Sequence, residues 1–553
     1  MNATEIPTRR DWVGLAVLSA GLGMIVLDGT IVGVALPTII RDLKMDLTDA
    51  QWVNSLYAVL LAALLLSTGR LSDRWGRKKL FLIGIVIFIG GSVLAAQSET
   101  AGFLIASRAV QAVGAALIMP ATLSSVNATF RGKYRGAAFG VWGAVISGAA
   151  AVGPLAGGAL TQWGSWEWVF LVNVPLGLAI FIGALMTVRE SKGAKGRPGA
   201  DIDGALLSGL GFGALVFAVI EGPSVGWWTP TSELRILSFV WPTSAPISIV
   251  PIAAAVAVAS ITGFIFWERH RARVQRSALL DLDLFRLPTF TWGNLTAAMV
   301  AVGEFAIIFI LPLYLINALG MDVMGAGLVL AAMAIGAFLS GASARHLAAR
   351  FGSPGTVLIG LGLEVVGIGA LALVVSGTTP AWIVAMPLVL YGLGLGLASA
   401  QLTGTVLRDV PIEVSGAGSA TQSTMRQIGS ACGTALAGAA LAVSLAVTLP
   451  AALERAGETG AEAEAIAEAT RQSAGSTIET LRTEGSSSLG DRTDAVVSAL
   501  AEGFADGTRW ALLIGSIFLI IGFISAVGLR ASSRTVPAAE STTGSIRTQD
   551  APS

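Results

Sequence analysis

Residues 69–79 read GRLSDRWGRKK and stand between two long apolar runs. Gly69 and Gly76 permit a tight turn, and Asp73 can pair with a neighbouring arginine or cap a helix. The basic residues around them hold such a stretch on the cytoplasmic side of a membrane. A simple positive anchor would carry the same charge, but the spacing of its glycines, acid and arginine is specific. We therefore expect a short cytoplasmic gating loop formed by Gly69, Asp73, Arg74, Gly76 and Arg77.

The composition indicates an integral membrane protein. The chain has 553 residues, a mean hydropathy of +0.74 and only 13% charged residues. An ordinary soluble domain has about 25% charged residues and could not bury this much apolar surface. The zero net charge does not indicate a nucleic-acid partner. One cysteine, Cys432, and two histidines leave little material for a disulfide, a metal cluster or a histidine-based catalytic triad.

Fourteen apolar runs are long enough to cross a bilayer as helices, which takes about 20 residues each. An even number of spans places both termini on one side. The short loops on the other side carry only Arg41, Lys44 and Arg235, so the positive-inside rule predicts that both termini are cytoplasmic, in a bacterial inner membrane. The predicted spans are 12–36, 50–69, 80–97, 101–125, 136–160, 169–188, 203–221, 248–267, 290–315, 324–344, 355–376, 381–402, 416–448 and 510–530.

An internal repeat groups these spans into two halves. RLSDRWG at 70–76 is matched, 276 residues later, by HLAARFG at 346–352. Each copy follows the second span of a six-span block, which predicts an all-α fold of two parallel six-helix bundles with two inserted helices. Asp73 corresponds to Ala349, so the two halves are not expected to play identical roles.

The repeat and the charge pattern predict the following organisation. In chain order, we expect a cytoplasmic tail (1–11), a six-helix bundle (12–188), a basic cytoplasmic linker (189–202), two inserted helices (203–267), a cytoplasmic linker (268–289), a second six-helix bundle (290–530) and a disordered cytoplasmic tail (531–553). The second bundle contains a long acidic extracytoplasmic loop at 449–509. Its piece AEAEAIAEATRQ is strongly helix-forming and is expected to be a solvated surface helix.

Four further motifs lie in the first half: LDGTIVGVALP (27–37), RAVQAVG (108–114), GAAAVGPLAGG (148–158) and WEWVFLVNVPLG (166–177). The third has small residues on neighbouring helix faces, which allow another helix to approach closely. Its proline removes one backbone hydrogen bond and bends the helix. Such a helix could be a moving seal, although small-residue packing is common in membranes. The candidate seal residues are Gly153, Pro154, Gly157 and Gly158.

Together with GRLSDRWGRKK, these motifs resemble those of the major facilitator superfamily, and in particular its fourteen-span drug:proton antiporters of the EmrB/QacA type. The resemblance covers all fourteen spans and is strongest in the first six. Three positions depart from the family pattern: Gly33 stands for Asn, Ala112 for Gly and Glu167 for Arg. The resemblance implies alternating access around a central cavity, and export of amphipathic or cationic small molecules in exchange for protons, as in multidrug efflux and antibiotic resistance.

Charged residues inside the predicted spans are the sharpest functional indication. A carboxylate at the middle of a bilayer costs roughly 2.5–3.5 kcal/mol to insert, so it is rarely idle. The predicted proton-coupling residues are Asp28, Arg108, Glu304 and Glu364. A buried carboxyl group can hold a proton near neutral pH, and a cation beside it would compete with that proton. Each acid could instead form a structural ion pair, with Arg108 or Arg426 as its partner.

Aromatic and methionine side chains suit a promiscuous cavity because they are polarizable and adaptable. Many such side chains in membrane helices face lipid or a neighbouring helix instead. The candidate substrate-binding residues are Met24, Trp52, Tyr57, Met119, Trp142, Phe305, Phe309, Tyr314 and Asn317.

Two other functions remain open. The same fold could export one endogenous metabolite, such as an amino acid, a lipid or a siderophore. A receptor or an enzyme is the second alternative, but the sequence offers no nucleophile–base pair and no phosphate-binding G-x-x-x-x-G-K-[ST] stretch. We therefore expect no enzyme activity, no cofactor, no metal, no ATP and no nucleic acid. The expected partners are a small-molecule substrate, protons and the lipid bilayer, with the proton gradient as energy source.

Overall fold

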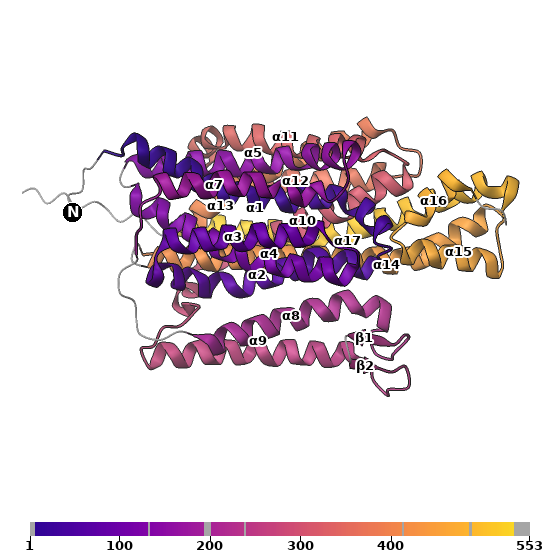
Figure 1. Ribbon diagram of the computed structural model, residues 1–553, viewed down its shortest axis with the longest axis horizontal. Coiled ribbons are helices and arrows are strands. Elements are labelled where there is room, and N and C mark those ends of the chain that lie inside the picture. The colour runs from indigo at the N-terminus through magenta and orange to yellow at the C-terminus, as the bar shows by residue number, and fades with distance from the viewer. Residues whose placement is uncertain are drawn as a thin grey trace, which may run out of the picture.

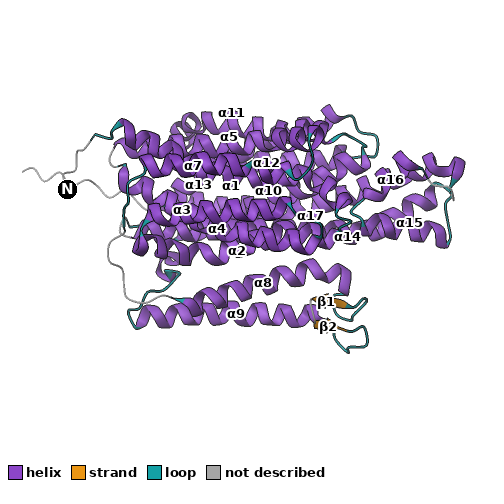
Figure 2. Cartoon of the chain, in the orientation of Figure 1, coloured by secondary structure: helices purple, strands orange, loops and turns teal. Residues whose placement is uncertain are grey.

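The computed structural model describes residues 6–130, 133–192, 201–236, 239–411, 414–485 and 489–535. Most of the predicted basic linker and most of the predicted C-terminal tail lie outside these residues. The described chain is a bundle of long, nearly parallel helices, with a separate helix pair beside it (Figure 1). Helices dominate the described residues, whose strands form one small hairpin (Figure 2).

Long helices make up most of the first half and of the inserted pair. Helices often begin at a capping side chain, such as Thr8, whose hydroxyl accepts from the Asp11 amide, or Asp46, which accepts from the Asp49 amide. The elements are α1 (Arg9–Asp42), α2 (Leu47–Trp75), α3 (Arg77–Ala96), α4 (Ala101–Thr129), α5 (Lys133–Trp163), α6 (Trp168–Leu171), α7 (Asn173–Thr187), α8 (Ile202–Val225), β1 (Leu234–Ile236), β2 (Phe239–Trp241) and α9 (Ile249–Arg273). The two strands are antiparallel, with Leu234 opposite Trp241.

The second half begins with a 3-10 turn and ends with a very long helix. The π-helical turn η2 continues α10 without a break, as its backbone dihedrals remain helical. The elements are η1 (Leu282–Arg286), α10 (Pro288–Leu313), η2 (Tyr314–Ala318), α11 (Val323–Phe351), α12 (Ser353–Val374), α13 (Ala381–Val406), α14 (Ser415–Arg455), α15 (Ala461–Gln472), α16 (Ser476–Glu484), η4 (Gly490–Arg492) and α17 (Thr493–Thr535).

Thirteen of the described helical segments are long and apolar enough to cross a membrane. They include the continuous segment Trp168–Thr187, which α6 and α7 form together. Helix α5 has 31 residues and occupies the position of the remaining predicted span. The chain thus has the fold predicted from its sequence, with two six-helix bundles and a two-helix insert.

Two predicted loops are helical instead. Residues 69–79 were expected to form a loop, but α2 runs to Trp75 and α3 starts at Arg77, so Gly76 alone connects them. The predicted loop 449–509 is largely helix, because α14 and α17 continue beyond the bundle and α15 and α16 form a hairpin between them (Figure 1). The piece AEAEAIAEATRQ is α15, as expected. Strong helix formers explain the continuation, and α14 runs on past Pro450 to Arg455.

The sequence repeat corresponds to a structural repeat. Helix α2 covers 47–75 and α11 covers 323–351, so that both ends differ by the same 276 residues as the two sequence motifs. The connecting glycines, Gly76 and Gly352, both have positive φ angles, of 125° and 75°. A side chain would strain this backbone, so glycine is required at both turns.

The bundle has two distinguishable ends. We call the end with the α2–α3 and α11–α12 turns the basic end, since Arg74, Lys78, Lys79, Arg345 and Arg350 lie there. The opposite end, with α15, α16, β1 and β2, is the hairpin end (Figure 1). The described chain begins and ends at the basic end.

The inserted pair lies against one side of the bundle. Helix α8 packs on both α2 and α14, through a small apolar cluster of Val59, Val216, Ile220 and Ala435. At the hairpin end, Trp52 Nε1 of α2 donates to Glu221 Oε1 of α8 at 2.9 Å. Helix α8 therefore covers the seam between the two halves on this side.

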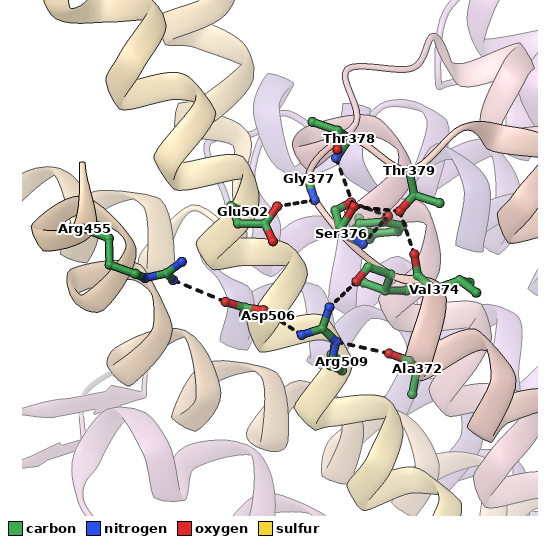
Figure 3. A network of polar contacts seen from close by, with 12 residues as sticks. Ala372, Val374, Ser376, Gly377, Thr378, Thr379, Arg455, Glu502, Asp506 and Arg509 are labelled. Atoms are coloured by element: carbon green, nitrogen blue, oxygen red, sulfur yellow. Dashed lines mark hydrogen bonds and ion pairs between the residues drawn. The ribbon is translucent and has the colours of Figure 1, made fainter.

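A polar network holds the second bundle together at the hairpin end (Figure 3). Arg509 of α17 donates to the carbonyl oxygens of Ala372 at 3.2 Å and Val375 at 2.6 Å, where α12 ends. It also pairs with Asp506 at 3.0 Å. Glu502, also of α17, accepts from the Gly377 amide through its Oε2 at 2.7 Å. The network caps α12 with side chains from α17.

We predict that Arg509→Ala lowers the free energy of unfolding by about 2–3 kcal/mol, because two helix-terminal carbonyl groups lose a charged donor. Arg455→Ala is the control. Arg455 also contacts Asp506, at 3.3 Å, but its side chain is 59% exposed, so its removal should cost under about 1 kcal/mol. Thermal denaturation of the purified variants in detergent measures both. Equal losses would contradict the capping role of Arg509.

Candidate functional site

A large cavity lies between the two halves. Its volume is about 2300 Å³, and its walls come mainly from α1, α2, α4, α5, α10, α11, α13 and α14. The lining residues extend from Gly33, Asn54 and Pro154 in the interior to Arg74 and Arg345 at the basic end. Because the lining residues at the basic end are exposed, the cavity opens there.

At the hairpin end the halves approach closely through small residues. A methyl group built on Gly327 of α11 would lie 2.6 Å from the carbonyl oxygen of Pro154 in α5. On Gly158 of α5 it would lie 3.0 Å from Met324 Cα in α11, and on Gly33 of α1 it would lie 2.8 Å from Ile308 Cγ2 in α10. These contacts, two of them with backbone atoms, bring the two halves together toward the hairpin end.

The predicted seal residues divide between two interfaces. Pro154 and Gly158 face α11 across the two halves, as just described. Gly153 and Gly157 instead face α1 within the first half. A methyl group on Gly157 would lie 2.8 Å from the Ile31 carbonyl oxygen, and one on Gly153 would overlap Thr30. Two of the four candidates therefore lie where a seal between the halves must lie.

Asp28 is the centre of a buried polar network in the first half. Its carboxylate is fully buried and forms an ion pair with Arg108 of α4. Asp28 Oδ1 also accepts from Asn173 Nδ2 of α7 at 2.7 Å and from Gln111 Nε2 of α4 at 3.2 Å. Ser92 of α3 accepts from Gln111 at 2.7 Å. One carboxylate thus connects α1, α4 and α7, with α3 joined through its partners.

Arg108 separates Asp28 from the cavity. Arg108 lines the cavity, whereas Asp28 does not. The guanidinium carbon lies 4.3 Å from the centroid of the Tyr57 ring, which also lines the cavity. This cation–π contact holds the Arg108 guanidinium group against the Tyr57 ring at the cavity wall. In this conformation Arg108 meets the cavity and Asp28 does not.

Glu304 lies on the cavity wall of the second half. It is 276 residues from Asp28, the spacing of the structural repeat, and so it occupies the corresponding position on α10. Arg426 of α14 donates to Glu304 Oε2 at 3.1 Å. The side chains of Glu304 and Arg426 are 14% and 46% exposed, and both line the cavity. The two halves thus place corresponding carboxylates in opposite settings, one sealed and one open.

Glu364 lies behind Glu304, in the interior of the second bundle. It is fully buried on α12, and neither carboxyl oxygen has a hydrogen-bond partner among the described residues. Tyr391 of α13 is also buried, and its hydroxyl group likewise lacks a partner in the described chain. Glu364 does not line the cavity, so it cannot contact a substrate in this conformation.

The signature stretch is held at the basic end by a residue from outside it. Glu190, just after α7, accepts from the amides of Lys78 and Lys79 at 3.1 and 3.2 Å. A methyl group on Gly76 would lie 2.6 Å from Glu190 Oε1. The Arg77 amide donates to the Ser191 carbonyl group at 3.0 Å. The stretch is therefore a capped helix junction, tied to the end of the first bundle.

Only some of the other predicted gating residues line the cavity. Gly69 and Arg74 line the cavity near its opening. The side chain of Asp73 lies outside the described part of the structure, although its backbone belongs to α2.

Five of the nine predicted substrate-binding residues line the cavity: Tyr57, Met119, Trp142, Phe305 and Phe309. The other four do not line the cavity in this conformation. Met24 is packed in the core, and Trp52 bonds to Glu221 of α8. Tyr314 donates to the Ser376 carbonyl group, and Asn317 to the Ala474 carbonyl group, both at the hairpin end. Helical periodicity alone does not distinguish cavity, core and cap for such residues.

Several site residues were not predicted. Gln111 and Asn173 bond Asp28 directly, and both lie within the quoted motifs RAVQAVG and WEWVFLVNVPLG. Polar amide side chains within these apolar motifs were therefore a signal in the sequence, because a buried polar group needs a hydrogen-bond partner. Polar residues of α13 and α14, such as Gln401, Gln422 and Gln427, also line the cavity. They stand outside the quoted motifs, and their position follows only from the packing of the second half.

The comparisons with known proteins agree on one family. The sequence profile described as Major Facilitator Superfamily matches residues 18–434. The tetracenomycin C resistance and export protein of Streptomyces glaucescens is 30% identical, over 77% of this chain and 75% of that protein. The multidrug efflux pump LfrA of Mycolicibacterium smegmatis is 32% identical, over 78% of this chain and 81% of that pump.

A solved structure has the same fold. It is a bacterial homolog of the human lysosomal transporter Spinster in an inward-facing, unoccupied conformation. The TM-score is 0.60, with 19% sequence identity, and the match covers 96% of this chain and 99% of that one.

We predict that Gly327→Ala loosens the seal at the hairpin end, because its methyl group would lie 2.6 Å from a backbone oxygen. Gly341→Ala on the same helix is the control, since its methyl group would meet nothing closer than 3.7 Å. The reporter is Asn54→Cys in a Cys432→Ser background, labelled with an impermeant maleimide from the hairpin-end side. Labelling should rise at least about threefold only with Gly327→Ala. Equal labelling in both variants would contradict the seal.

We predict that Arg108→Gln lowers the free energy of unfolding by about 3–5 kcal/mol, because it leaves Asp28 as a buried charge without its ionic partner. The double variant Asp28→Asn with Arg108→Gln should recover most of this stability. Arg426→Gln should have a smaller effect, since Arg426 is 46% exposed. Denaturation temperatures of the four proteins in one detergent test this. A single Arg108→Gln variant as stable as the unmodified protein would refute it.

Proposed function

Since the chain belongs to the major facilitator superfamily, we propose that it is a proton-coupled antiporter that exports amphipathic or cationic small molecules. We assign it to the fourteen-span drug:proton antiporters, on the fourteen helices and the sequence motifs. Export of an antibiotic or of several drugs is the named activity of two relatives.

The observation that carries this proposal is the Glu304–Arg426 pair on the cavity wall. Glu304 is a carboxylate within reach of a substrate, and its only ionic partner in the described chain is the half-exposed Arg426. An incoming cationic group can replace Arg426 beside Glu304, and a proton can do the same by neutralising the carboxylate. Substrate and proton then exclude each other, which is the simplest form of antiport.

The surrounding wall fits an amphipathic substrate. Tyr57, Phe305 and Phe309 supply aromatic surface near the two charged pairs, and Met119 supplies an adaptable side chain. A cavity of about 2300 Å³ exceeds the 300–1,000 Å³ of ordinary ligand pockets. Room of this kind supports several binding positions rather than one close-fitting site.

We assign the basic end to the cytoplasm, where lysine and arginine accumulate in membrane proteins. Both chain ends then lie in the cytoplasm, and the cavity opens inward. Export requires the α5–α11 contact to separate while the basic end closes. A membrane potential contributes about 2.3 kcal/mol per elementary charge and 100 mV to a net charge movement, so entering protons can drive the substrate out.

Asp28 has a different role in this proposal. Its ion pair with Arg108 leaves no room for a substrate beside it. Movement of Arg108 toward the cavity would expose Asp28 to a proton and open the α1–α4 connection. We therefore assign substrate competition to Glu304 and a coupled proton step in the first half to Asp28 and Arg108, with Glu364 as a buried acid that supports Glu304.

We predict that wild-type protein, expressed in a host without its own efflux pumps, removes several unrelated amphipathic cations, and that an uncoupler stops this efflux. Glu304→Gln should lower the efflux rate at least about tenfold, because the neutral side chain no longer distinguishes a proton from a cation. Asp28→Asn should have a similar effect. Dye fluorescence in cells with matched expression measures the rate.

Asp283→Asn is the control for Glu304→Gln, since Asp283 also lines the cavity but pairs with Arg286 at the surface. No efflux of any compound by folded wild-type protein would refute multidrug export. Efflux of a single endogenous compound would favour the dedicated metabolite exporter.

A further inference from the structure

A second group of buried charges lies at the base of the inserted pair, away from Glu304 and Asp28. It consists of Asp201 at the start of α8, Glu268 and Arg271 near the end of α9, Arg70 of α2, and the segment 274–281 that leaves α9. This segment and Asp201 line the cavity opening. The proposed exchange mechanism gives this group no role.

Asp201 joins α8 to α9. Its Oδ1 accepts from the Gly204 amide at 3.0 Å and from Trp267 Nε1 at 2.8 Å. Its Oδ2 lies 3.1 Å from Arg271 Nε. Arg271 also donates to the Ser277 carbonyl group, at 2.9 and 2.7 Å, and the Ser277 hydroxyl group accepts from Arg70. The insert, the segment 274–281 and α2 are thus fastened in one cluster, which we call the clasp.

Glu268 is the incomplete member of the clasp. It is fully buried, and its Oε2 accepts the Leu280 amide at 3.0 Å. Its Oε1 is buried and has no hydrogen-bond partner in the described chain. A buried carboxylate oxygen without a donor is costly, so this oxygen calls for a hydrogen that the protein does not supply.

The carboxyl group of Asp201 lies on the same side of Gly204 as the unpartnered Glu268 Oε1. A methyl group built on Gly204 would lie 2.6 Å from Glu268 Oε1 and 2.9 Å from Asp201 Oδ1. Oxygens of both carboxyl groups therefore lie beside Gly204, on the first turn of α8. Two neighbouring carboxylates in a buried site cannot both remain charged without cost, and they commonly share one proton.

The charges around the pair are balanced when one proton is added. Arg70 of α2 interacts electrostatically with both acids, and also with Arg271 of α9 and Asp281 of the following segment. With Asp201 and Glu268 ionised, three carboxylates would face two guanidinium groups. The other charged residues nearby, Asp203, Arg269, His270, Arg273 and Arg276, are exposed to solvent. One proton therefore neutralises this group of five charges.

We propose that Asp201 and Glu268 form a proton-binding site, supplied from cytoplasmic water at the cavity opening, and that the bound proton keeps the clasp closed. The proton completes a hydrogen bond between the two carboxyl groups and removes their mutual repulsion. When it leaves for water, the repulsion returns and the segment 274–281 loosens from α8 and α2. This site is separate from the carboxylates that face the substrate.

The clasp links proton binding to the movement of the two halves. The segment after α9 leads directly into η1 and α10, and Arg70 belongs to the helix before the signature stretch. A closed clasp ties α2 to the start of the second bundle and so favours the conformation that opens inward. An acidic cytoplasm then slows the transporter, which limits further proton entry. This consequence, unlike the proton site itself, rests on the proposed function.

The first test does not need transport. Hydrogen exchange of residues 274–287 is measured by mass spectrometry at pH 6 and pH 8 on the full-length protein in lipid nanodiscs. Each rate is divided by that of an unstructured peptide of the same sequence at the same pH. The corrected rate in wild-type protein should be at least about fivefold higher at pH 8. In Glu268→Gln, which cannot lose a proton but can donate to Asp201, it should change less than about twofold.

Two variants complete the design. Asp203→Asn, an exposed acid on the first turn of α8, should keep the wild-type pH response. Ser277→Ala removes the acceptor of Arg70 and should raise exchange already at pH 6. A pH-independent wild type would overturn the proposal, and so would a Glu268→Gln variant with the full pH response. If Glu268→Gln does not fold, the Ser277→Ala result decides, because unchanged exchange at pH 6 would also overturn the clasp.

Transport in proteoliposomes is the second test. With the proton gradient held constant, the wild-type rate should fall at least about threefold when the cytoplasmic face goes from pH 8 to pH 6. Glu268→Gln should be slow at both values. Transport by wild type that ignores this change would refute the regulatory consequence. A wild type without any transport would refute the proposed function, whereas the exchange result would still stand.

Discussion

A charge inside a membrane-embedded bundle must be compensated locally, and this constraint shapes the protein. Asp28 is fully buried, so Arg108, Gln111 and Asn173 converge on it from two other helices. These contacts position α1, α4 and α7 relative to one another. Glu304, at the corresponding position of the second half, has only Arg426 and remains accessible. The same constraint thus produces a rigid connection in one half and an exchangeable one in the other.

The fold was predictable because its signals are long and repeated. Apolar runs of about 20 residues mark the helices whatever their neighbours are. The 276-residue spacing of RLSDRWG and HLAARFG carries over to the ends of α2 and α11 and to the positive φ angles of Gly76 and Gly352. Helix ends were harder, since residues 69–79 read as a polar loop but continue as helix up to a single glycine.

The site was predictable only in part. The intramembrane charges were identified from the cost of burying them, and each acid of the two ion pairs was paired with a partner already named as an alternative. Which aromatic residues face the cavity was not predictable, because Tyr57 and Trp52 lie on the same helix and differ only in the surface they contact. The role of Glu190 at the signature stretch depends on a contact across more than 100 residues. Sequence spacing carries no information about such a contact.

The seam cover formed by α8 makes the two sides of the transporter unequal. Helix α8 contacts both α2 and α14, whereas α8 and α9 make no extensive contact with α5 or α11 in the described chain. Separation of the halves on the covered side must also break van der Waals contacts with α8, which drive helix association within lipid. Among the described residues, separation on the α5–α11 side breaks no such extensive contact with α8. The contact between α5 and α11 should therefore separate more easily than the contact between α2 and α14, which α8 reinforces.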